Sequence, residues 1–497
     1  MNSIKNICII VAVLSGIIFT TGCTKLDETF YDQIPAELYP ENEAQVATLA
    51  VNAYKPLQDM ADDNGWWFLA QEISSDELCG PTRGADWYDG GKWVDLHTHT
   101  WTNDTESVNR MWSAFFNGIN QCNRTIESLQ KIGDSEQILA KIAELETLRS
   151  FYYYLFMDNY GDVPYVTEIL GESAQPEKTK RADIYEQLVE NVTKNLPLLN
   201  SGDLKYMATK NMAYALLAKL YLNAEVYTGT PQWEKAGMYC DSVINGPYRL
   251  SGSVGAPFVT ENQNSPEIIF SIPYDENDFP GFRLHMRTLH YQHNLTFNMP
   301  VGPWNGFAVV PSHFDLYQEE DLRREAHFIW GPQYAADGSE IIESVTGEPL
   351  VIDPYLPELS MGDNYTPLEI RTSGARIGKY EIKMGAKENL SNDFPLFRLS
   401  DFYLMKAETE IRLGRNGDQW VNPIRTRAGV APFSGCTLEQ LLEERGREMF
   451  VEGHRRQDLI RFNRWNNGWW EKDAHGDDKN TFPIPQWAID GNPNLGS

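Results

Sequence analysis

The chain has 497 residues, with 42 Lys or Arg against 70 Asp or Glu, and its net charge is −28. A negative field of this size repels polyphosphates, so the charge argues against a nucleic-acid partner. Apolar residues make up 42% of the chain, which is enough at this length to fill a large core without a disulfide scaffold or a structural metal.

Residues 1–22 have the pattern of an export signal. A lysine near the start is followed by an apolar run, 7–19, that is too short to span a bilayer. Cleavage before Cys23 would free a thiol for lipid attachment, although Thr20 stands where such a cleavage site usually has leucine. An ordinary secretory signal cut near the same place is the alternative. We therefore expect a mature chain, 23–497, that is held at a membrane only through lipid on Cys23.

The first helical pair is predicted at about 43–60 and about 107–131. The connection between these helices, 62–101, has no clear periodicity, and a connection of this length in a compact domain is more often functional than a linker. It carries five tryptophans and one tyrosine, which are Trp66, Trp67, Trp87, Tyr88, Trp93 and Trp101.

The side chains of this loop suit a sugar. Aromatic faces can stack on the C–H face of a pyranose or furanose ring, while carboxylates and arginine hydrogen-bond its hydroxyl groups. We predict that five residues contact such a ligand, namely Arg83, Asp86, Trp87, Tyr88 and Trp93. The alternative is an Ω-like loop that packs its own tryptophans, which applies most to Trp66 and Trp67.

A strongly periodic helix is predicted at 141–160. Its apolar residues recur at steps of three and four, Gly161 supplies the left-handed residue that ends a helix, and Pro164 prevents its continuation. Further helices are expected at 181–199, 207–227 and 233–244. Because such helices cannot bury their apolar faces alone, we expect the pairs to stack as tetratricopeptide-like repeats do.

The helical pattern lapses in a long insertion at about 247–393. Its segment SPEIIFSIPY predicts a short strand. Tyr291 and Trp304 stand among glycine and proline, where an aromatic side chain is more readily exposed than on a periodic helix. Trp304 either contacts a ligand or packs the insertion onto the helices. We predict that the ligand site forms where the loop 83–93 meets Tyr291 and Trp304.

A final helical pair, 398–414 and 438–453, lies within a dense set of arginines and carboxylates. Glu448 and Glu452 share a helix face, as a catalytic carboxylate pair could. Every carboxylate in the set has an arginine within a few positions, however, and such pairing lowers a carboxyl pKa, whereas a glycosidase acid needs a raised one. We therefore expect no catalytic residue here and interpret the set as a structural lock.

Metal and cofactor sites are not predicted. Asp86 and Asp89 lack the spaced ligand run of a calcium loop. The histidines at 97 and 99 have no third ligand, and those at 285, 290 and 293 do not form an HExxH pattern. The four cysteines after the signal form no CxxC motif, and Cys122 continues a helical apolar stripe, as a buried free thiol would.

Five segments closely resemble, in this order, the landmarks of the SusD/RagB family. They are AELETLRSFYYYLFMDNYGDVPYV, ATKNMAYALLAKLYLNAEVY, FPLFRLSDFYLMKAETEIRLGR, VNPIRTRAG and ERGREMFVEGHRRQDLIRF. Members of this family are glycan-binding outer-membrane lipoproteins of Bacteroidetes that cap a TonB-dependent, SusC-like transporter. The resemblance covers nearly the whole mature chain, and it implies a single SusD-like domain over 23–497 that is displayed on the cell exterior.

These patterns together predict a mainly α protein, with about four tetratricopeptide-like helix pairs over 43–246 and 397–465 and an irregular, partly β insertion over 247–393. The expected function is capture of oligosaccharides and their delivery to a SusC-like transporter in the outer membrane. Two alternatives stay open. A surface glycoside hydrolase explains the aromatic residues equally well, and a repeat-type protein-interaction module explains the helices but leaves the tryptophan loop unused.

Overall fold

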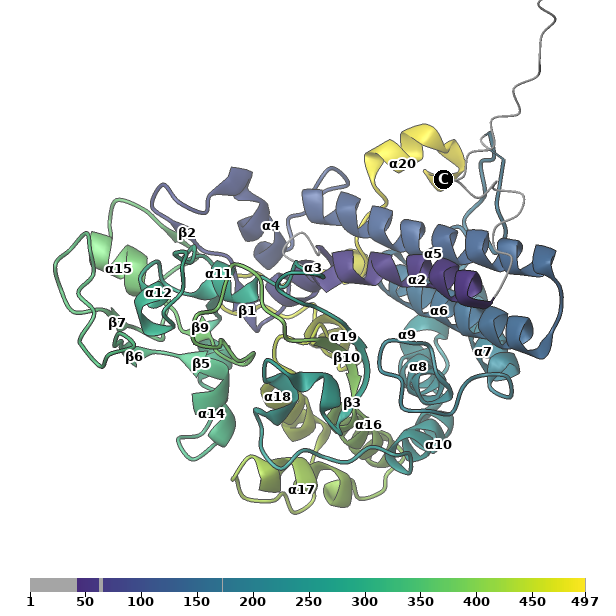
Figure 1. Ribbon diagram of the computed structural model, residues 1–497. Coiled ribbons are helices and arrows are strands. Elements are labelled where there is room, and N and C mark those ends of the chain that lie inside the picture. The colour runs from purple at the N-terminus through teal and green to yellow at the C-terminus, as the bar shows by residue number, and fades with distance from the viewer. Residues whose placement is uncertain (1–42, 62–65, 172, 497) are drawn as a thin grey trace, which may run out of the picture.

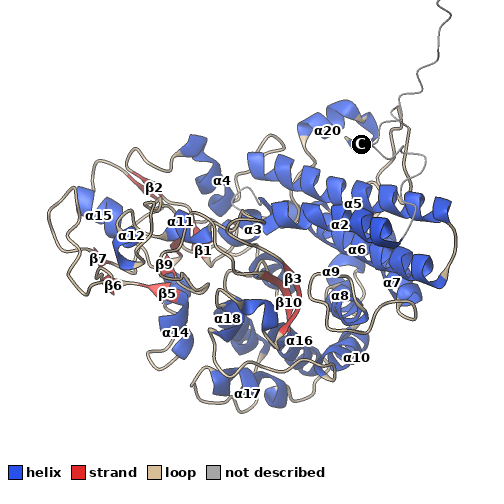
Figure 2. Cartoon of the chain, viewed as in Figure 1, coloured by secondary structure: helices blue, strands red, loops and turns tan. Residues whose placement is uncertain are grey.

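The computed structural model describes residues 43–61, 66–171 and 173–496. The predicted export signal and lipid attachment at Cys23 lie outside these residues. Helices make up most of the regular structure, and the strands are short (Figure 2). Within the described part of the chain, no helix is both long and apolar enough to cross a bilayer.

The helices fall into three groups along the chain (Figure 1). Before the insertion come α2 (Glu43–Ala61), α3 (Trp66–Ile73), α4 (Lys92–Thr98), α5 (Glu106–Ile132), α6 (Glu136–Tyr160), α7 (Arg181–Asn195), α8 (Lys210–Leu222), α9 (Ala224–Thr228) and α10 (Trp233–Ile244). The insertion contains α11 (Leu284–Thr288), α12 (His293–Thr296), α13 (Pro311–Phe314), α14 (Leu322–His327) and α15 (Pro367–Thr372). After it come α16 (Leu399–Arg412), α17 (Asp418–Arg427), α18 (Leu438–Met449), α19 (Arg455–Arg461) and α20 (Gln486–Gly491).

The strands of the described residues form five two-stranded sheets. They are β1 (Leu78–Cys79) with β4 (Ala308–Val309), β2 (Thr82–Arg83) with β8 (Ser360–Met361), β3 (Ile268–Ile272) with β10 (Phe394–Arg398), β5 (Phe328–Ile329) with β9 (Arg376–Ile377), and β6 (Gly331–Pro332) with β7 (Val351–Ile352). The strand predicted within SPEIIFSIPY is β3, which confirms that prediction. The first two sheets join the loop before α4 to the insertion, and so they position the site described below.

Long helices pack in pairs, as the periodicity predicts. α2 packs along α5, α5 along α6, α6 along α7, and α8 along α10, while α16 packs against α10, α17 and α18. α5 and α6 approach closely at Gly118, where a Cβ atom would lie 2.4 Å from the ring of Tyr152. The predicted mainly α fold is confirmed.

Three element boundaries differ from the prediction. The segment 207–227 is two helices, because the chain breaks at Asn223, whose side chain donates to the main-chain oxygen of Lys219 at 3.0 Å. The connection 62–101 contains the short helices α3 and α4. α17 lies between the two helices of the last predicted pair and packs against α16.

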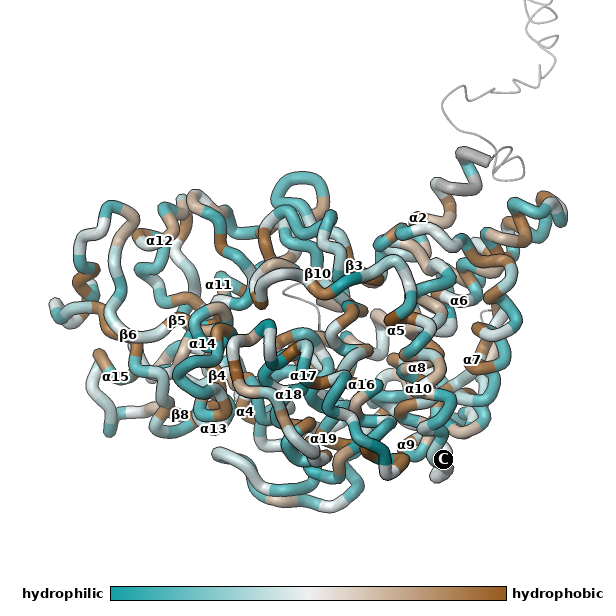
Figure 3. Tube along the Cα trace, turned by 90° about the horizontal axis from the view of Figure 1, so that it is seen from below, coloured by the Kyte–Doolittle hydropathy of each residue, from teal (hydrophilic) through white to brown (hydrophobic). Residues whose placement is uncertain are grey.

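The insertion and the helical pairs occupy opposite ends of the molecule. Both views place α11, α12 and α15 at one end and α5 to α8 at the other (Figures 1 and 3). One hydrophobic cluster nevertheless runs from α2 through the insertion to the C-terminal segment. The insertion is therefore packed onto the helices through shared core.

The predicted arginine and carboxylate lock is present near α16 and α18. Arg398 is buried and contacts Glu448 at 2.7 Å, Glu452 at 2.6 Å and Glu267 at 2.9 Å. Burial alone would raise the pKa of Glu448, but Arg427, Arg398 and Arg323 hold that pKa well below its ordinary value. Glu448 and Glu452 thus serve to bind arginine, as the sequence indicates.

Candidate functional site

The loop after β2 has an unusual backbone conformation. Trp87 and Asp89 have φ angles of 59° and 43°. This left-handed region costs residues other than glycine about 1 to 2 kcal/mol each. Two main-chain hydrogen bonds between Arg83 and Asp86, of 2.9 and 3.1 Å, close the turn. Such strain persists only where the surrounding structure holds the residue in place. Here the contacts of the Trp87 side chain hold it.

The indole of Trp87 is fixed against the insertion. Its Nε1 donates to the main-chain oxygen of Trp304 at 2.7 Å, across 217 positions of chain. The ring also covers Gly306, where a Cβ atom would lie 2.2 Å from the indole, so a larger residue cannot take this place. Phe307 packs against the same indole at a ring-centroid distance of 5.2 Å. The segment that carries Trp304 therefore holds the strained loop.

A stack of aromatic rings lies behind Trp87. Trp93 meets Phe307 edge to face at 5.1 Å and stacks on Trp66 at 5.4 Å, with 15° between the planes. Only 1% of Trp93 is exposed, and its Nε1 donates to Asp89 at 2.8 Å. Trp93 is thus a core residue whose edge reaches the site.

An open cavity of about 510 Å³ lies in front of this stack, and we call it the aromatic pocket. It is lined by Asp86, Trp87, Asp89, Lys92, Trp93, Arg287, Tyr291, Pro303 and Trp304. Five of the seven predicted ligand-contacting residues are in this set, from two segments that the sequence analysis placed together.

Tyr291 and Trp304 form the wall that the insertion contributes, and both are half-buried. The hydroxyl of Tyr291 donates to the Asp86 carboxylate. Burial, with a further contribution from Asp86, raises the pKa of Tyr291 to about 12, so the phenol remains protonated at neutral pH. The main-chain N–H of Trp304 donates to Met286 at 2.7 Å, and the Arg287 guanidinium lies 5.7 Å from the Trp304 ring centroid.

This lining combines apolar faces with hydrogen-bonding groups. Lys92 makes a 3.2 Å ion pair with Glu106, so its ammonium is held at the pocket edge. Tyr291 has given its only donor to Asp86, which leaves its oxygen to accept a bond from a ligand. Such a surface matches a ligand that has a flat apolar face and several hydroxyl groups.

Two of the predicted residues, Arg83 and Tyr88, lie outside the lining. Arg83 is only 3% exposed, and it donates to the main-chain oxygens of Gly306 at 3.1 Å and Ile370 at 2.8 Å. Desolvation lowers the pKa of Arg83 to about 10. Its guanidinium is therefore buried and bound to main-chain oxygens of the insertion, outside the pocket lining. Tyr88 is 62% exposed and is not among the lining residues.

The sequence analysis missed four lining residues, which are Asp89, Lys92, Arg287 and Pro303. Asp89 and Lys92 lie within the loop 83–93 that was predicted to form part of the ligand site. Their position in this loop could have identified them as lining residues. Arg287 precedes Tyr291 by one helical turn, on the short helix α11, and no local pattern in the sequence marks it. Its place in the pocket follows from how the insertion folds.

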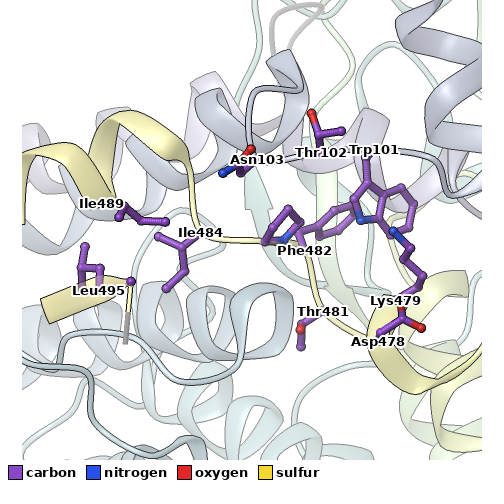
Figure 4. Close-up of a pocket in the computed structure, with 12 residues that line it drawn as sticks. Trp101, Thr102, Asn103, Asp478, Lys479, Thr481, Phe482, Ile484, Ile489 and Leu495 are labelled. Carbon is purple, nitrogen blue, oxygen red and sulfur yellow. The ribbon is translucent and has the colours of Figure 1, made fainter. Parts of the chain in front are cut away.

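The other tryptophans of the loop are buried. Trp66 and Trp67 belong to α3 and face the core, as the packing alternative predicts. Trp101 lines a second cavity of about 510 Å³, together with Phe482 at a ring-centroid distance of 4.7 Å (Figure 4). Most of that cavity is formed by the C-terminal segment 478–496, and it shares no residue with the aromatic pocket.

Histidines and cysteines contribute to packing. His97 and His99 hydrogen-bond to the main-chain oxygens of Trp470 at 2.8 Å and Ser74 at 2.7 Å. The four described cysteines are free and buried, Cys122 among them. The described residues contain no group of three or more His, Cys, Asp or Glu placed to hold a metal ion.

Comparison with known proteins gives two matching sequence families. One is described as the SusD family and matches residues 266–485, and the other, described as starch-binding and associating with the outer membrane, matches residues 27–222. The starch-binding protein SusD of Bacteroides thetaiotaomicron is 24% identical over 478 residues, which cover 86% of this chain and 84% of that protein. A SusD-like protein of Bacteroides ovatus is 22% identical over 487 residues, covering 89% and 82% of the two chains.

Solved structures share the fold. Surface glycan-binding protein A from Bacteroides thetaiotaomicron, in complex with laminarihexaose, has a TM-score of 0.74 at 21% identity and covers 91% of this chain and 98% of its own. A laminarin-binding SusD-like protein has a TM-score of 0.72 at 20% identity, with the same coverage of 91% and 98%.

Proposed function

Because this chain belongs to the SusD/RagB family, we propose that it binds oligosaccharides in the aromatic pocket and delivers them to a SusC-like transporter at the outer membrane. The observation that carries the proposal is the convergence of Trp87, Tyr291 and Trp304 on one open cavity. These residues come from segments far apart in the chain, and the strained loop is held in place by the insertion.

The size and composition of the pocket support a sugar ligand. Its volume of about 510 Å³ falls within the range of about 300 to 1,000 Å³ for small-molecule sites. The two half-buried rings can stack on pyranose faces, and Asp86 and Lys92 offer an acceptor and a donor to hydroxyl groups. The glycan ligands named for the related proteins agree in class with this chemistry.

The pocket gives less support to hydrolysis. A glycosidase needs one carboxyl group protonated at working pH and a second one placed across the bond. Asp86 and Asp89, the lining carboxylates, are already engaged as hydrogen-bond acceptors by Tyr291 and Trp93 of the pocket itself. We therefore propose a binding protein without catalytic activity.

Calorimetry with laminarihexaose and maltohexaose tests the binding site. Trp304→Ala is expected to weaken binding by about ten-fold or more, because a fully used aromatic face contributes on the order of 1 to 3 kcal/mol. Trp487→Ala is the matched control, since Trp487 is 51% exposed on α20 and outside the pocket. Equal affinity in the wild type and Trp304→Ala would exclude the pocket, and release of reducing sugar would favour the hydrolase.

Membrane attachment and the transporter are tested separately. Cys23→Ser should move the protein into soluble fractions if lipid on Cys23 is the anchor. A mild-detergent pull-down from cells should recover a SusC-like barrel protein. Unchanged membrane partitioning contradicts the anchor, and a pull-down without such a barrel contradicts the partnership.

A further inference from the structure

Tyr291 contacts Asp86 and Arg371 and lines the aromatic pocket. Its hydroxyl donates to Asp86, and the ring lines the aromatic pocket. The Arg371 guanidinium carbon lies 4.5 Å from the centroid of the Tyr291 ring, at cation–π distance. Arg371 is not among the residues that line the pocket, so it contacts the Tyr291 ring from outside the lining.

Arg371 is itself held firmly. Its Nε donates to Glu343 Oε1 at 2.7 Å, and its Nη2 lies 2.7 Å from the same oxygen. The Glu343 side chain is fully buried, and its other oxygen accepts the main-chain N–H groups of Val345 and Thr346, both at 2.9 Å. The guanidinium therefore cannot leave the ring without breaking the two bonds to a buried carboxylate.

The backbone of Arg371 is anchored as well. Its main-chain oxygen accepts bonds from Asn305 and Arg376, both at 3.0 Å. Asn305 follows Trp304 directly, so the support of the Tyr291 ring is joined to the segment that carries the second aromatic wall. α15, which ends one residue after Arg371, begins with a capping box at Thr366 and Glu369.

We propose that Arg371, held by Glu343, is a positioning residue that fixes the ring plane of Tyr291 as a wall of the aromatic pocket. The inference rests on the proposed function, because it assigns a role in ligand binding to residues that do not touch the ligand. A ring fixed before binding loses little rotational freedom when a sugar stacks on it, whereas a mobile ring must be ordered at the expense of affinity. No local sequence pattern marks either residue, and Glu343 and Arg371 are brought together across 28 positions.

Ring mobility in the free protein gives the first measurement. 3-Fluorotyrosine placed at position 291 should show two slowly exchanging ring orientations by fluorine NMR in the wild type. Arg371→Met should bring these signals into fast exchange, while Arg371→Lys, which keeps a cation, should be intermediate. An unchanged spectrum in Arg371→Met would overturn the proposal.

Affinity for laminarihexaose gives the second measurement. Arg371→Met is expected to bind about ten-fold more weakly than wild type and Arg371→Lys about three-fold, since the cation–π contact is lost in one and retained in the other. Arg324→Met is the control, because Arg324 lies 5.0 Å from the Phe314 ring in the same insertion but away from the pocket. Arg324→Met removes a cation–π contact of the same kind and should leave the affinity unchanged.

The two measurements separate the possible failures. If Arg371→Met frees the ring but binds laminarihexaose as the wild type does, the positioning role of Arg371 is refuted. The aromatic pocket is then still supported as the ligand site. If Arg324→Met weakens binding equally, the effect is one of general stability and the proposal fails. If the wild type binds no oligosaccharide, the proposed function fails, and the fluorine spectra still decide whether Arg371 fixes the ring.

Discussion

The aromatic pocket and the lock around Arg398 are both built from residue types that active sites use. They differ in whether these side chains are fully paired or remain partly exposed. In the lock, one buried arginine contacts three carboxylates, and the pKa of Glu448 is held low. In the pocket, Tyr291 and Trp304 keep half-exposed rings beside an open volume. Charged residues that are fully paired and buried stabilise the fold, whereas rings with one uncovered side can bind.

The largest expected effect is on the lock. Arg398→Met removes the cation that contacts the buried Glu448, Glu452 and Glu267 together, and breaking a buried pair in this way costs about 3 to 5 kcal/mol. Urea unfolding should show a lower midpoint, while the remaining folded protein binds oligosaccharide normally. Arg415→Met, at an exposed ion pair with Glu410, is the control and should change stability little.

The next effect falls on the junction of loop and insertion. Gly306→Ala places a Cβ atom 2.2 Å from the Trp87 indole, so the ring must move. Overpacking of this kind costs about 1 to 3 kcal/mol, and movement of Trp87 also disturbs the pocket. We expect a lower unfolding free energy together with weaker laminarihexaose binding. A variant that unfolds earlier but binds as the wild type does would show that Trp87 is dispensable for the ligand.

Two buried carboxyl groups, Glu72 of α3 and Asp458 of α19, should change the stability in opposite directions as the pH changes. Burial raises the pKa of Glu72 to about 8, so its contribution to stability is complete below the unfolded pKa of 4.5 and is lost as pH rises toward 8. The pKa of Asp458, lowered to about 2 by Arg445 and Arg461 against the effect of burial, gives stability that is lost as pH falls toward 2.

Glu72→Gln separates these two contributions. The variant should flatten the decline of unfolding free energy between pH 5 and 8, a decline of at most about 1.4 kcal/mol per pH unit. Urea titrations at several pH values measure it. An equally steep decline in Glu72→Gln would assign the effect to another group, whereas the loss of stability at acid pH should remain in both proteins.

The smallest expected effect is at Tyr88. Because its side chain is 62% exposed and outside the lining, Tyr88→Ala should change affinity by less than about two-fold and leave the thermal midpoint unaltered. A ten-fold loss in this variant would mean that a bound glycan extends beyond the pocket over the loop. Comparison with Trp304→Ala thus measures where the site ends.

The amino-acid sequence by itself determined the features that depend on local pattern. Apolar periodicity and a terminal glycine marked the helix that ends before Gly161, and the short apolar run in SPEIIFSIPY marked β3. Arginines near every carboxylate predicted that Glu448 would be paired. These signals are readable because each arises from neighbours within one or two helical turns.

Only the tertiary structure decided which of the loop residues face the pocket. Arg83 and Trp93 both have side chains suited to a ligand, yet β2 pairs with a strand of the insertion and Arg83 is buried outside the lining, whereas Trp93 stacks on Trp66 and still lines the pocket. Arg371 gave no sequence signal at all, although its guanidinium covers the Tyr291 ring. Exposure depends on partners such as Trp87 and Trp304, which meet across 217 positions of chain, and no local pattern encodes such a contact.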